Sequence, residues 1–322
     1  MPFIQKLKST VKKYGLIQKN DAVLAGVSGG PDSLALLYAL CCLKNEYSLK
    51  IYIAHLDHGL RKDSSSDALF VKSIAEKLKL PAIICKAHPS LSANKGSLEE
   101  AARNARIDFL CKLSRKLKAD KIALGHNFND QAETVLMRLI RGAGLYGLSG
   151  IWAKRKIFGC IFIRPLLEIS RKEIESYVRN KNIRARIDPT NKEEMFFRNK
   201  IRNKLLPLLI KEYNANMLEI LNNLADTASI DYDYLYCQAR KAARSFNNSI
   251  DLKKLAKLHP AIQRLVLRTV LSRLSGNTRR LNLQHIKELE DLIQNRPSNS
   301  VVDLPKGIFA LKSGNFLKFR RR

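Results

Sequence analysis

The residues best suited to chemistry form one short run early in the chain. An apolar stretch at 22–27 leads into the run, and an apolar segment with helical periodicity follows from residue 34. Adjacent glycines accept backbone angles that a side chain excludes, and proline suits the first turn of a helix. The pattern predicts a buried strand, a tight turn and a helix whose first N–H groups bind an anion. The run consists of Ser28, Gly29, Gly30, Pro31, Asp32 and Ser33.

The side chains of this run indicate phosphate and metal chemistry. The hydroxyls of Ser28 and Ser33 add hydrogen-bond donors, and the carboxylate of Asp32 is a ligand type that Mg²⁺ prefers. The run is neither a Walker A loop nor Gly-x-Gly-x-x-Gly, and its alternative is an ordinary capped turn. It resembles the SGGxDS loop of the N-type ATP pyrophosphatases. That resemblance implies that the run binds the pyrophosphate of ATP, which is cleaved between its α and β phosphates.

Apolar strands alternate with helices over the first half of the chain. This alternation predicts an α/β fold with a doubly wound parallel sheet. Ligands of such sheets bind beyond the carboxyl ends of the strands, so polar clusters at those ends should face one crevice. The expected strands are 22–27, 49–57, 81–85, 121–126 and 161–165, and the expected helices are 3–14, 33–43, 64–80, 97–118 and 130–141.

Two further polar clusters follow expected strands. His55 begins the sequence HLDHGLR, which could bind a metal or could form a simple polar turn. His126 and Asp130 lie in GHNFNDQAET, and Asp130 falls in a first helical turn, where a carboxylate also favours the helix dipole. We expect Asp130 to face Asp32 across the crevice, where it would hold Mg²⁺ or receive a proton.

Four arginines are candidates for neutralising phosphate charge. Arg103 and Arg106 share one face of the helix expected at 97–118, where a helical ion pair is the alternative role. Arg198 and Arg202 belong to the dense basic stretch RNKIRNK, and such stretches are commonly solvated faces.

The charge balance indicates a polyanionic partner. The chain has 58 Lys and Arg residues against 29 Asp and Glu residues, a formal net charge of +29. Nucleic acid is the simplest such partner, although a merely basic protein is the alternative. Phosphate contacts of this kind give affinity and orientation rather than sequence recognition. The candidates for RNA contact are Arg138, Arg141, Arg240, Lys241, Arg279 and Arg280.

Cysteine usage and hydropathy indicate a cytoplasmic protein. The six cysteines show no Cys-x-x-Cys spacing, which favours buried thiols in a reducing compartment over a structural metal site. No apolar run approaches the 18 residues of a membrane span. The first 13 residues are amphipathic and lack the features of a signal peptide.

Several motifs in a fixed order resemble the tRNA(Ile)-lysidine synthetases, a bacterial family. These motifs are SGGPDS, HLDHGLR, SLEEAARNAR, GHNFNDQAETVLMRLIRGAG, RPLL and DPTN followed by RNKIRNKLLP, and they span residues 21–210. The resemblance implies two substrates besides ATP: free L-lysine and a tRNA(Ile) with a CAU anticodon. It also implies that the wobble cytidine is adenylated before lysine attacks it. Family members are often dimeric, so a homodimer is compatible with the resemblance.

The resemblance assigns roles to the candidate residues. The run at 28–33 would bind pyrophosphate, and Asp32 and Asp130 would hold Mg²⁺ or orient the lysine amine. His55 and His126 are weaker candidates for nucleotide contact. Family members often have two consecutive aspartates where this chain has Asn129 and Asp130, so the metal-binding hypothesis rests on Asp130.

The C-terminal part of the chain resembles the family more loosely. We expect an ATP-binding catalytic domain at 1–210, a helical linker at 211–246 and a small α+β tRNA-binding domain at 247–322. The small domain should contain three helices and a terminal β-hairpin. It looks like the family's first C-terminal domain, as in a short form without a second one.

Two other functions fit parts of the pattern. A tRNA thiolase of the same loop class is the nearest enzyme, but thiolases commonly rely on paired cysteines that this chain lacks. A non-catalytic tRNA-binding protein is the alternative from another class, and the intact run with Asp32 and Asp130 argues against it.

Overall fold

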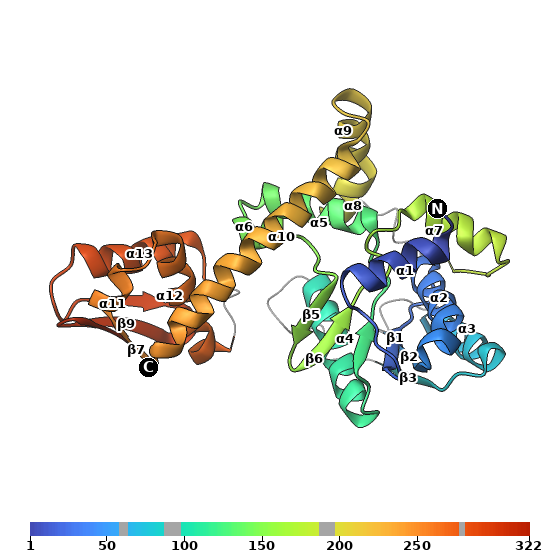
Figure 1. Cartoon of the computed structure of the whole chain (residues 1–322), viewed down its shortest axis with the longest axis horizontal. Coiled ribbons are helices and arrows are strands. Elements are labelled where there is room, and N and C mark those ends of the chain that lie inside the picture. Colours follow the sequence, from blue (N-terminus) through green and yellow to red (C-terminus); the bar gives the residue numbers. More distant parts are fainter. Residues whose placement is uncertain (58–63, 87–97, 187–196, 277–280) are drawn as a thin grey trace. The chain divides into compact units, whose positions relative to one another are not determined.

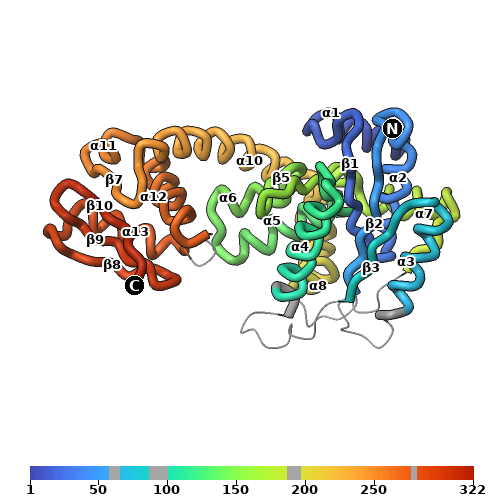
Figure 2. The backbone as a smooth tube through the Cα atoms, turned by 90° about the horizontal axis from the view of Figure 1, so that it is seen from below, coloured from blue at the N-terminus to red at the C-terminus, as the bar shows by residue number. Residues whose placement is uncertain are grey.

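The computed structural model describes residues 1–57, 64–86, 98–186, 197–276 and 281–322. The described residues form two compact units, Met1–Asp226 and Thr227–Arg322 (Figures 1 and 2). Helix α10 (Met217–Ala242) carries the chain from the first unit to the second. The three-part division expected from the sequence stays a prediction.

The first unit is built on a mostly parallel sheet, which confirms the predicted fold class. Among the described residues, six strands lie in the order β3-β2-β1-β4-β6-β5, and only β5 runs antiparallel to its neighbour. The strands are β1 (Ala22–Gly26), β2 (Lys50–Asp57), β3 (Ala82–Lys86), β4 (Lys121–Ala123), β5 (Lys154–Ile157) and β6 (Cys160–Ile163). The helices are α1 (Phe3–Lys13), α2 (Pro31–Tyr47), α3 (Ser64–Leu78), α4 (Leu98–Lys116), α5 (Phe128–Ile140), α6 (Leu145–Leu148), α7 (Arg171–Asn180), α8 (Phe197–Lys200), a π-helix (Ile201–Leu205) and α9 (Leu206–Glu212).

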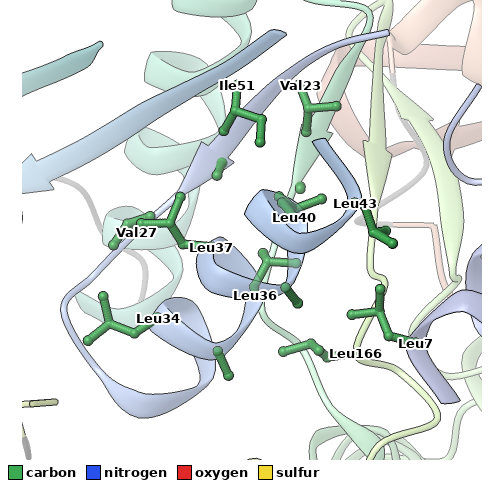
Figure 3. Close-up of a cluster of buried hydrophobic side chains, with 14 of the residues drawn as sticks. Leu7, Val23, Val27, Leu34, Leu36, Leu37, Leu40, Leu43, Ile51 and Leu166 are labelled. Carbon is green, nitrogen blue, oxygen red and sulfur yellow. The ribbon is translucent and has the colours of Figure 1, made fainter. Parts of the chain in front are cut away.

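Both faces of this sheet are covered by helices, because the strands carry apolar side chains on both faces. Val23 and Val27 of β1 and the turn after it pack with Leu37 of α2 (Figure 3). Leu24 points the other way and packs with Leu110 of α4. Burial on both faces is typical of parallel strands. Because β1 and β4 pair in parallel, their carboxyl ends lie beside each other.

The strand order places a topological switch point between β1 and β4. From β1 the chain builds outward through β2 and β3, and it then returns to the other side of β1 as β4. Ligands of open α/β sheets bind at such a point, beyond the carboxyl ends of the strands. The run at 28–33 follows β1, and the segment that contains Asp130 follows β4, so both predicted clusters lie at the switch point.

The second unit has a four-stranded antiparallel sheet in the order β7-β10-β9-β8. Helices α12 and α13 pack on it through a separate apolar core that includes Val270, Leu289 and Leu317 (Figure 1). This arrangement agrees with the expected small α+β domain. Its elements are β7 (Ser249–Asp251), α11 (Leu252–Ala256), α12 (Pro260–Ser275), α13 (Leu283–Gln294), β8 (Val301–Leu304), β9 (Ile308–Ser313) and β10 (Phe316–Arg321).

The structure corrects several expected elements. The antiparallel edge strand β5 was not expected, because three of its four residues are exposed and basic. Helix α7 was also not expected, although Ser170 and Glu173 form a capping box at its start. The expected terminal β-hairpin is formed by β9 and β10, which pair antiparallel from Ile308 opposite Arg321 to Ser313 opposite Phe316. None of the helices in the described ranges combines the length and apolar character that crossing a membrane requires.

Candidate active site

The run at 28–33 forms a tight turn that is held by its own serines. Ser33 Oγ donates to the carbonyl of Gly30 at 2.9 Å and accepts the backbone N–H of Ser28 at 3.1 Å. No side chain caps the first turn of α2, where Gly30 is the N-cap residue and Pro31 the first helical residue. Because the start of a helix carries partial positive charge and unsatisfied N–H groups, this turn can bind a phosphate group.

Two glycines make the geometry of the turn possible. Gly29 has φ of +89°, in the left-handed region that favours glycine. Gly125 lies two residues after the end of β4, and a Cβ atom built there would be 2.9 Å from the carbonyl oxygen of Asp32. Glycine therefore lets the segment after β4 approach the start of α2 directly. Arg186 closes the other side, because its backbone N–H donates to the carbonyl of Gly29 at 3.0 Å.

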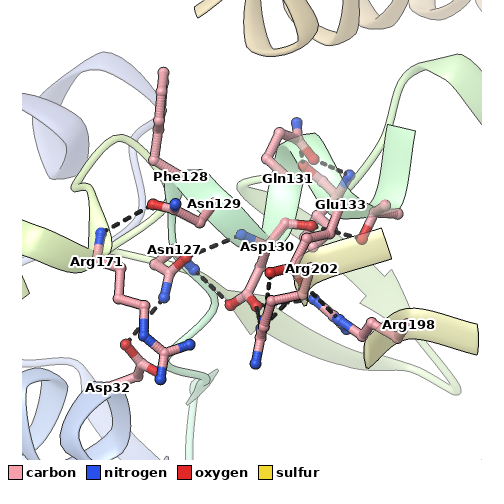
Figure 4. Close-up of polar contacts among 12 residues, drawn as sticks. Asp32, Asn127, Phe128, Asn129, Asp130, Gln131, Glu133, Arg171, Arg198 and Arg202 are labelled. Atoms are coloured by element: carbon pink, nitrogen blue, oxygen red, sulfur yellow. Dashed lines mark hydrogen bonds and ion pairs between the residues drawn. The ribbon is translucent and has the colours of Figure 1, made fainter. Parts of the chain in front are cut away.

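Asn127 connects the two carboxylates that were predicted to face each other (Figure 4). Its side-chain Nδ2 donates to Asp32 Oδ1 at 2.9 Å, and its Oδ1 accepts the backbone N–H of Asp130 at 2.9 Å. Asp130 Oδ2 in turn accepts the backbone N–H of Asn127 at 3.0 Å, which completes a capping box for α5. The structure therefore brings Asp32 and Asp130 together through one amide side chain.

Asp130 also belongs to a cluster of two carboxylates and two arginines. Arg198 and Arg202 donate to Asp130 Oδ1 at 2.8 and 3.1 Å. Both arginines also bind Glu133, with Arg198 Nε 2.8 Å from Oε2 and Arg202 Nε 2.5 Å from Oε1. The Glu133 side chain is only 2% exposed, whereas the two arginines are 25% and 23% exposed. The carboxylates thus contact both guanidinium groups from the buried side, and the arginine side chains remain partly exposed to solvent.

The ionisation of Asp32 is sensitive to its surroundings. Burial and the negative charge of Asp130 raise the pKa of Asp32, and the hydrogen bond from Asn127 and the charges of Arg171 and Arg202 oppose that rise. A positive ligand beside Asp32 would favour its charged form.

The two predicted histidines lie near the carboxyl ends of β2 and β4, the two strands that flank β1. His55 is buried, and its Nδ1 lies 2.8 Å from the carbonyl oxygen of Val27, immediately before the turn. Burial and the positive charges of Arg164, Arg106, Arg198 and Arg103 lower the pKa of His126 well below its usual value. The imidazole of His126 is therefore neutral near pH 7.

The predicted RNA contacts are partly engaged within the chain. Arg138 Nη1 donates to two backbone carbonyls beyond α5, and the Arg141 guanidinium lies 5.1 Å from the ring centre of Phe197. Arg240 and Lys241, at the end of α10, are exposed. Arg279 and Arg280 lie outside the described residues, as do most of HLDHGLR and all of DPTN.

Three polar residues of this region were not selected from the sequence. Glu133 lies one helical turn after Asp130, and this spacing could have identified it. Asn127 is the N-cap residue of α5, and asparagine is so common at this position that its type alone does not indicate a contact with Asp32. Arg164, in the RPLL motif, is only 5% exposed although arginine is normally a surface residue.

The donor set fits Mg²⁺ at Asp32 better than at Asp130. Both carboxylate oxygens of Asp130 already accept N–H groups, from Asn127 and from two arginines. Within the described part of the chain, the side chain of Asp32 accepts one hydrogen bond, from Asn127. Among the described residues, no group of three or more His, Cys, Asp or Glu side chains is placed to hold a metal by itself. Mg²⁺ commonly needs only one or two carboxylates when phosphates supply other ligands.

Comparisons with known proteins match both units. A family model described as a PP-loop domain matches residues 1–209, and one described as the TilS substrate binding domain matches residues 250–312. A tRNA(Ile)-lysidine synthase from Clostridioides difficile is 39% identical over 317 residues, covering 95% of this chain and 68% of that protein. One from Caldanaerobacter subterraneus is 37% identical over 328 residues, covering 99% and 69%.

A solved structure supports the fold alone. The U34-tRNA thiolase NcsA from Methanococcus maripaludis, with its [4Fe-4S] cluster, aligns with a TM-score of 0.55 at 20% identity. The alignment covers 70% of this chain and 80% of that one.

Proposed function

The chain belongs to the tRNA(Ile)-lysidine synthase family, and on this premise we propose that it uses ATP to join free L-lysine to tRNA(Ile). The acceptor is C2 of the wobble cytidine in a CAU anticodon, and the product is lysidine. The single observation that carries the proposal is the meeting of the phosphate-binding turn with the cluster of Asp130, Glu133, Arg198 and Arg202 at the switch point.

The first step makes the cytosine C2 oxygen a leaving group. That oxygen attacks the α phosphate of ATP, so an O–P bond forms to AMP while the bond to pyrophosphate breaks. The N–H groups at the start of α2 lie where the departing pyrophosphate would bind. Catalysis of this step consists mainly of positioning and neutralising phosphate charge, which the exposed sides of Arg198 and Arg202 can supply.

The second step forms the C–N bond. The neutral ε-amine of lysine attacks C2, the C2–O bond breaks, and AMP leaves with that oxygen. Asp130 lies one amide side chain from Asp32 and can orient the attacking amine or take its proton. Glu133 is a positioning residue in this scheme, because it contacts the arginines from their buried side.

Mg²⁺ would be held by Asp32 together with ATP phosphates. When bound, it would neutralise phosphate charge during adenylation. In this proposal Asp130 binds Arg198 and Arg202 and does not bind the metal. This differs from the sequence-based hypothesis, in which Asp32 and Asp130 both held Mg²⁺.

The second unit would hold the tRNA. Its exposed Arg240 and Lys241 suit contacts with phosphate groups, and the matched substrate binding domain lies in the same unit. With tRNA, ATP and lysine as substrates, we place the reaction in the cytoplasm. A homodimer is a separate proposal that sedimentation of the purified chain would test.

Turnover assays test the proposed function. We expect radioactive lysine to enter a tRNA(Ile) transcript with a CAU anticodon, with steady pyrophosphate release that needs tRNA, ATP and lysine together. A transcript with uridine at the wobble position is the matched control and should remain unlabelled. Binding of tRNA without any pyrophosphate release would favour a non-catalytic protein, and sulfur transfer to the tRNA would favour a thiolase.

A further inference from the structure

The phosphate-binding turn (residues 28–33) receives one of its hydrogen bonds from a distant part of the chain. Its N–H groups can bind an anion only when nearby carbonyl oxygens, which carry partial negative charge, point elsewhere. Ser33 Oγ, inside the turn, donates to the carbonyl of Gly30 at 2.9 Å. The carbonyl of Gly29 instead accepts the backbone N–H of Arg186 at 3.0 Å. Arg186 therefore orients one peptide group of the anion site.

The hydrogen bond from Arg186 also determines where the N–H of Gly30 points. The peptide bond between Gly29 and Gly30 is trans and planar, so its C=O and N–H groups point in opposite directions. Gly30 is the N-cap residue of α2, and its nitrogen lies 3.4 Å from Ser28 Oγ, inside the turn. Because glycine restricts its backbone angles less than other residues do, this peptide group needs an external partner to keep one orientation.

The side chain of Arg186 is held on helix α3. Arg186 Nη1 donates to Asp67 Oδ1 at 2.8 Å and also to Ser66 Oγ. The guanidinium carbon lies 5.2 Å from the ring centre of Phe70, which is within the range of a cation–π contact. Asp67 belongs to the first turn of α3, and Phe70 lies one turn later. The backbone of Arg186 thus contacts the phosphate-binding turn, while its side chain contacts a separate helix.

Helix α3 also contacts the turn directly. A Cβ atom built on Gly29 would lie 3.3 Å from Phe70 Cδ1, so the Phe70 ring packs against Gly29. Phe70 therefore contacts both Gly29 and the guanidinium group of Arg186. Because the side chain and the backbone of Arg186 both belong to this group of contacts, loss of Asp67 should alter the orientation of the peptide between Gly29 and Gly30.

We propose that Arg186 is a positioning residue for the phosphate-binding turn: Asp67 holds its side chain, and this keeps its backbone N–H on the carbonyl of Gly29. The inference rests on the proposed function, in which the turn binds the pyrophosphate of ATP. Direct contact between the guanidinium group and phosphate is the alternative. The ion pair with Asp67 disfavours that alternative, because this guanidinium already donates to an anion of the chain itself.

The test compares Asp67→Ala with Glu290→Ala. The ion pair of Arg264 and Glu290 is a matched control, because it lies in the second unit and its side chains are 46% and 24% exposed. The side chains of Arg186 and Asp67 are 41% and 19% exposed. The full chain is titrated calorimetrically with pyrophosphate in the presence of Mg²⁺, without tRNA or lysine. We expect Asp67→Ala to raise the Kd for pyrophosphate about three- to tenfold, and Glu290→Ala to change it less than about twofold.

The direction of this change separates positioning from direct phosphate contact. Removing a carboxylate near the turn lowers its repulsion of phosphate, and it also releases the guanidinium group. A direct role of Arg186 therefore predicts unchanged or tighter binding by Asp67→Ala, and either result overturns the proposal. Arg186→Gln and the double variant should weaken binding about as much as Asp67→Ala does, because the two residues act as one unit. A double variant that loses the product of the two single factors also overturns the proposal.

Hydrogen exchange of the ligand-free chain provides a second measurement. The backbone amides of 28–33 should exchange faster in Asp67→Ala than in Glu290→Ala, and equal exchange in the two variants contradicts the proposal. Partly exposed ion pairs contribute little to stability, so the melting temperatures of both variants should stay within about 3 °C of that of the unchanged chain. If Arg186→Gln does not fold, Asp67→Ala still decides between the two roles.

The pyrophosphate titration also keeps this inference separate from the proposed function. If pyrophosphate binding depends on Asp67 but the unchanged chain modifies no tRNA, the proposed function fails and the role of Arg186 is retained. If the chain forms lysidine and its pyrophosphate binding does not depend on Asp67, only the positioning role is lost. If the unchanged chain binds no pyrophosphate, both proposals fail.

Discussion

Replacing Glu133 by glutamine should destabilise the first unit, because this residue holds two arginines from their buried side. Glu133 accepts N–H groups from Arg198 Nε and from Arg202 Nε and Nη2. Glutamine has nearly the same volume, so Glu133→Gln removes the charge without leaving a cavity. The two guanidinium groups would then still share Asp130 as a carboxylate partner.

The size of the effect follows from the burial of the partners. Removing one member of a fully buried ion pair costs about 3–5 kcal/mol, and a hydrogen bond to a charged group contributes about 1.5–3 kcal/mol. Glu133 is 2% exposed, but the arginines are about a quarter exposed, so water recovers part of the loss. We therefore expect the free energy of unfolding to fall by about 2–3 kcal/mol. This corresponds to a melting temperature about 5–10 °C lower.

The fluorescence of Trp152 provides a suitable measurement, because it is the chain's single tryptophan and lies in the first unit. Glu175→Gln is the matched control. Glu175 also pairs with an arginine, at 3.1 Å, but its side chain is 51% exposed, and exposed pairs contribute about 0–1 kcal/mol. If both variants unfold at the same urea concentration, the reasoning that Glu133 is the buried anchor of the cluster is refuted.

Four further changes test other parts of the site. Asp130→Ala should retain tRNA binding and lose lysidine formation, as filter binding and lysine incorporation would show. Gly125→Ala should cost about 1–3 kcal/mol, because its Cβ would meet the start of α2 at 2.9 Å, and calorimetry would measure the loss. Changing both Arg240 and Lys241 to glutamine should lower the slope of log affinity for tRNA against log salt by about 2. Burial raises the pKa of Glu168, but hydrogen bonds from the side chains of Lys13, Tyr14 and Thr10 outweigh burial, so the pKa is lowered. The stability that this lowered pKa provides is fully present above the ordinary carboxylate pKa and is lost as pH falls through the lowered pKa of the folded state. Glu168→Gln should therefore show a smaller loss of melting temperature on acidification.

The sheet could be predicted from the sequence because its central strands are apolar on both faces. The strand at Ala22–Gly26 and the helix that follows it agree with the expected elements, since burial and turn chemistry indicate the same structure. The edge strand β5 has mostly exposed basic residues, and an exposed edge carries little of the apolar signal that defines a strand. Local patterns therefore predict the centre of a sheet better than its edge.

The positions of the candidate site residues could be predicted where those residues lie close together in the sequence. Gly29 and Ser33 act within one turn, so the run of six residues sufficed to select them. Arg198 and Glu133 are 65 residues apart in the chain, and only the folded structure brings them together. A pattern search could propose each as a charged residue, but it had no means of pairing them.

The formal charge of +29 suggested a basic surface for RNA, and the structure divides those basic residues into two kinds. Arg198 and Arg202 are neutralised by carboxylates, and Arg164 is buried, so none of the three is an ordinary surface charge that attracts tRNA from solution. Long-range attraction of a polyanion depends on exposed residues such as Arg240 and Lys241. Dissolved salt screens the electrostatic field of such residues. In the proposed function, Arg198 and Arg202 would act on phosphate groups at contact distance, where screening by salt is weak. Under the proposed function, the same residue type would support tRNA capture in one unit and substrate chemistry in the other.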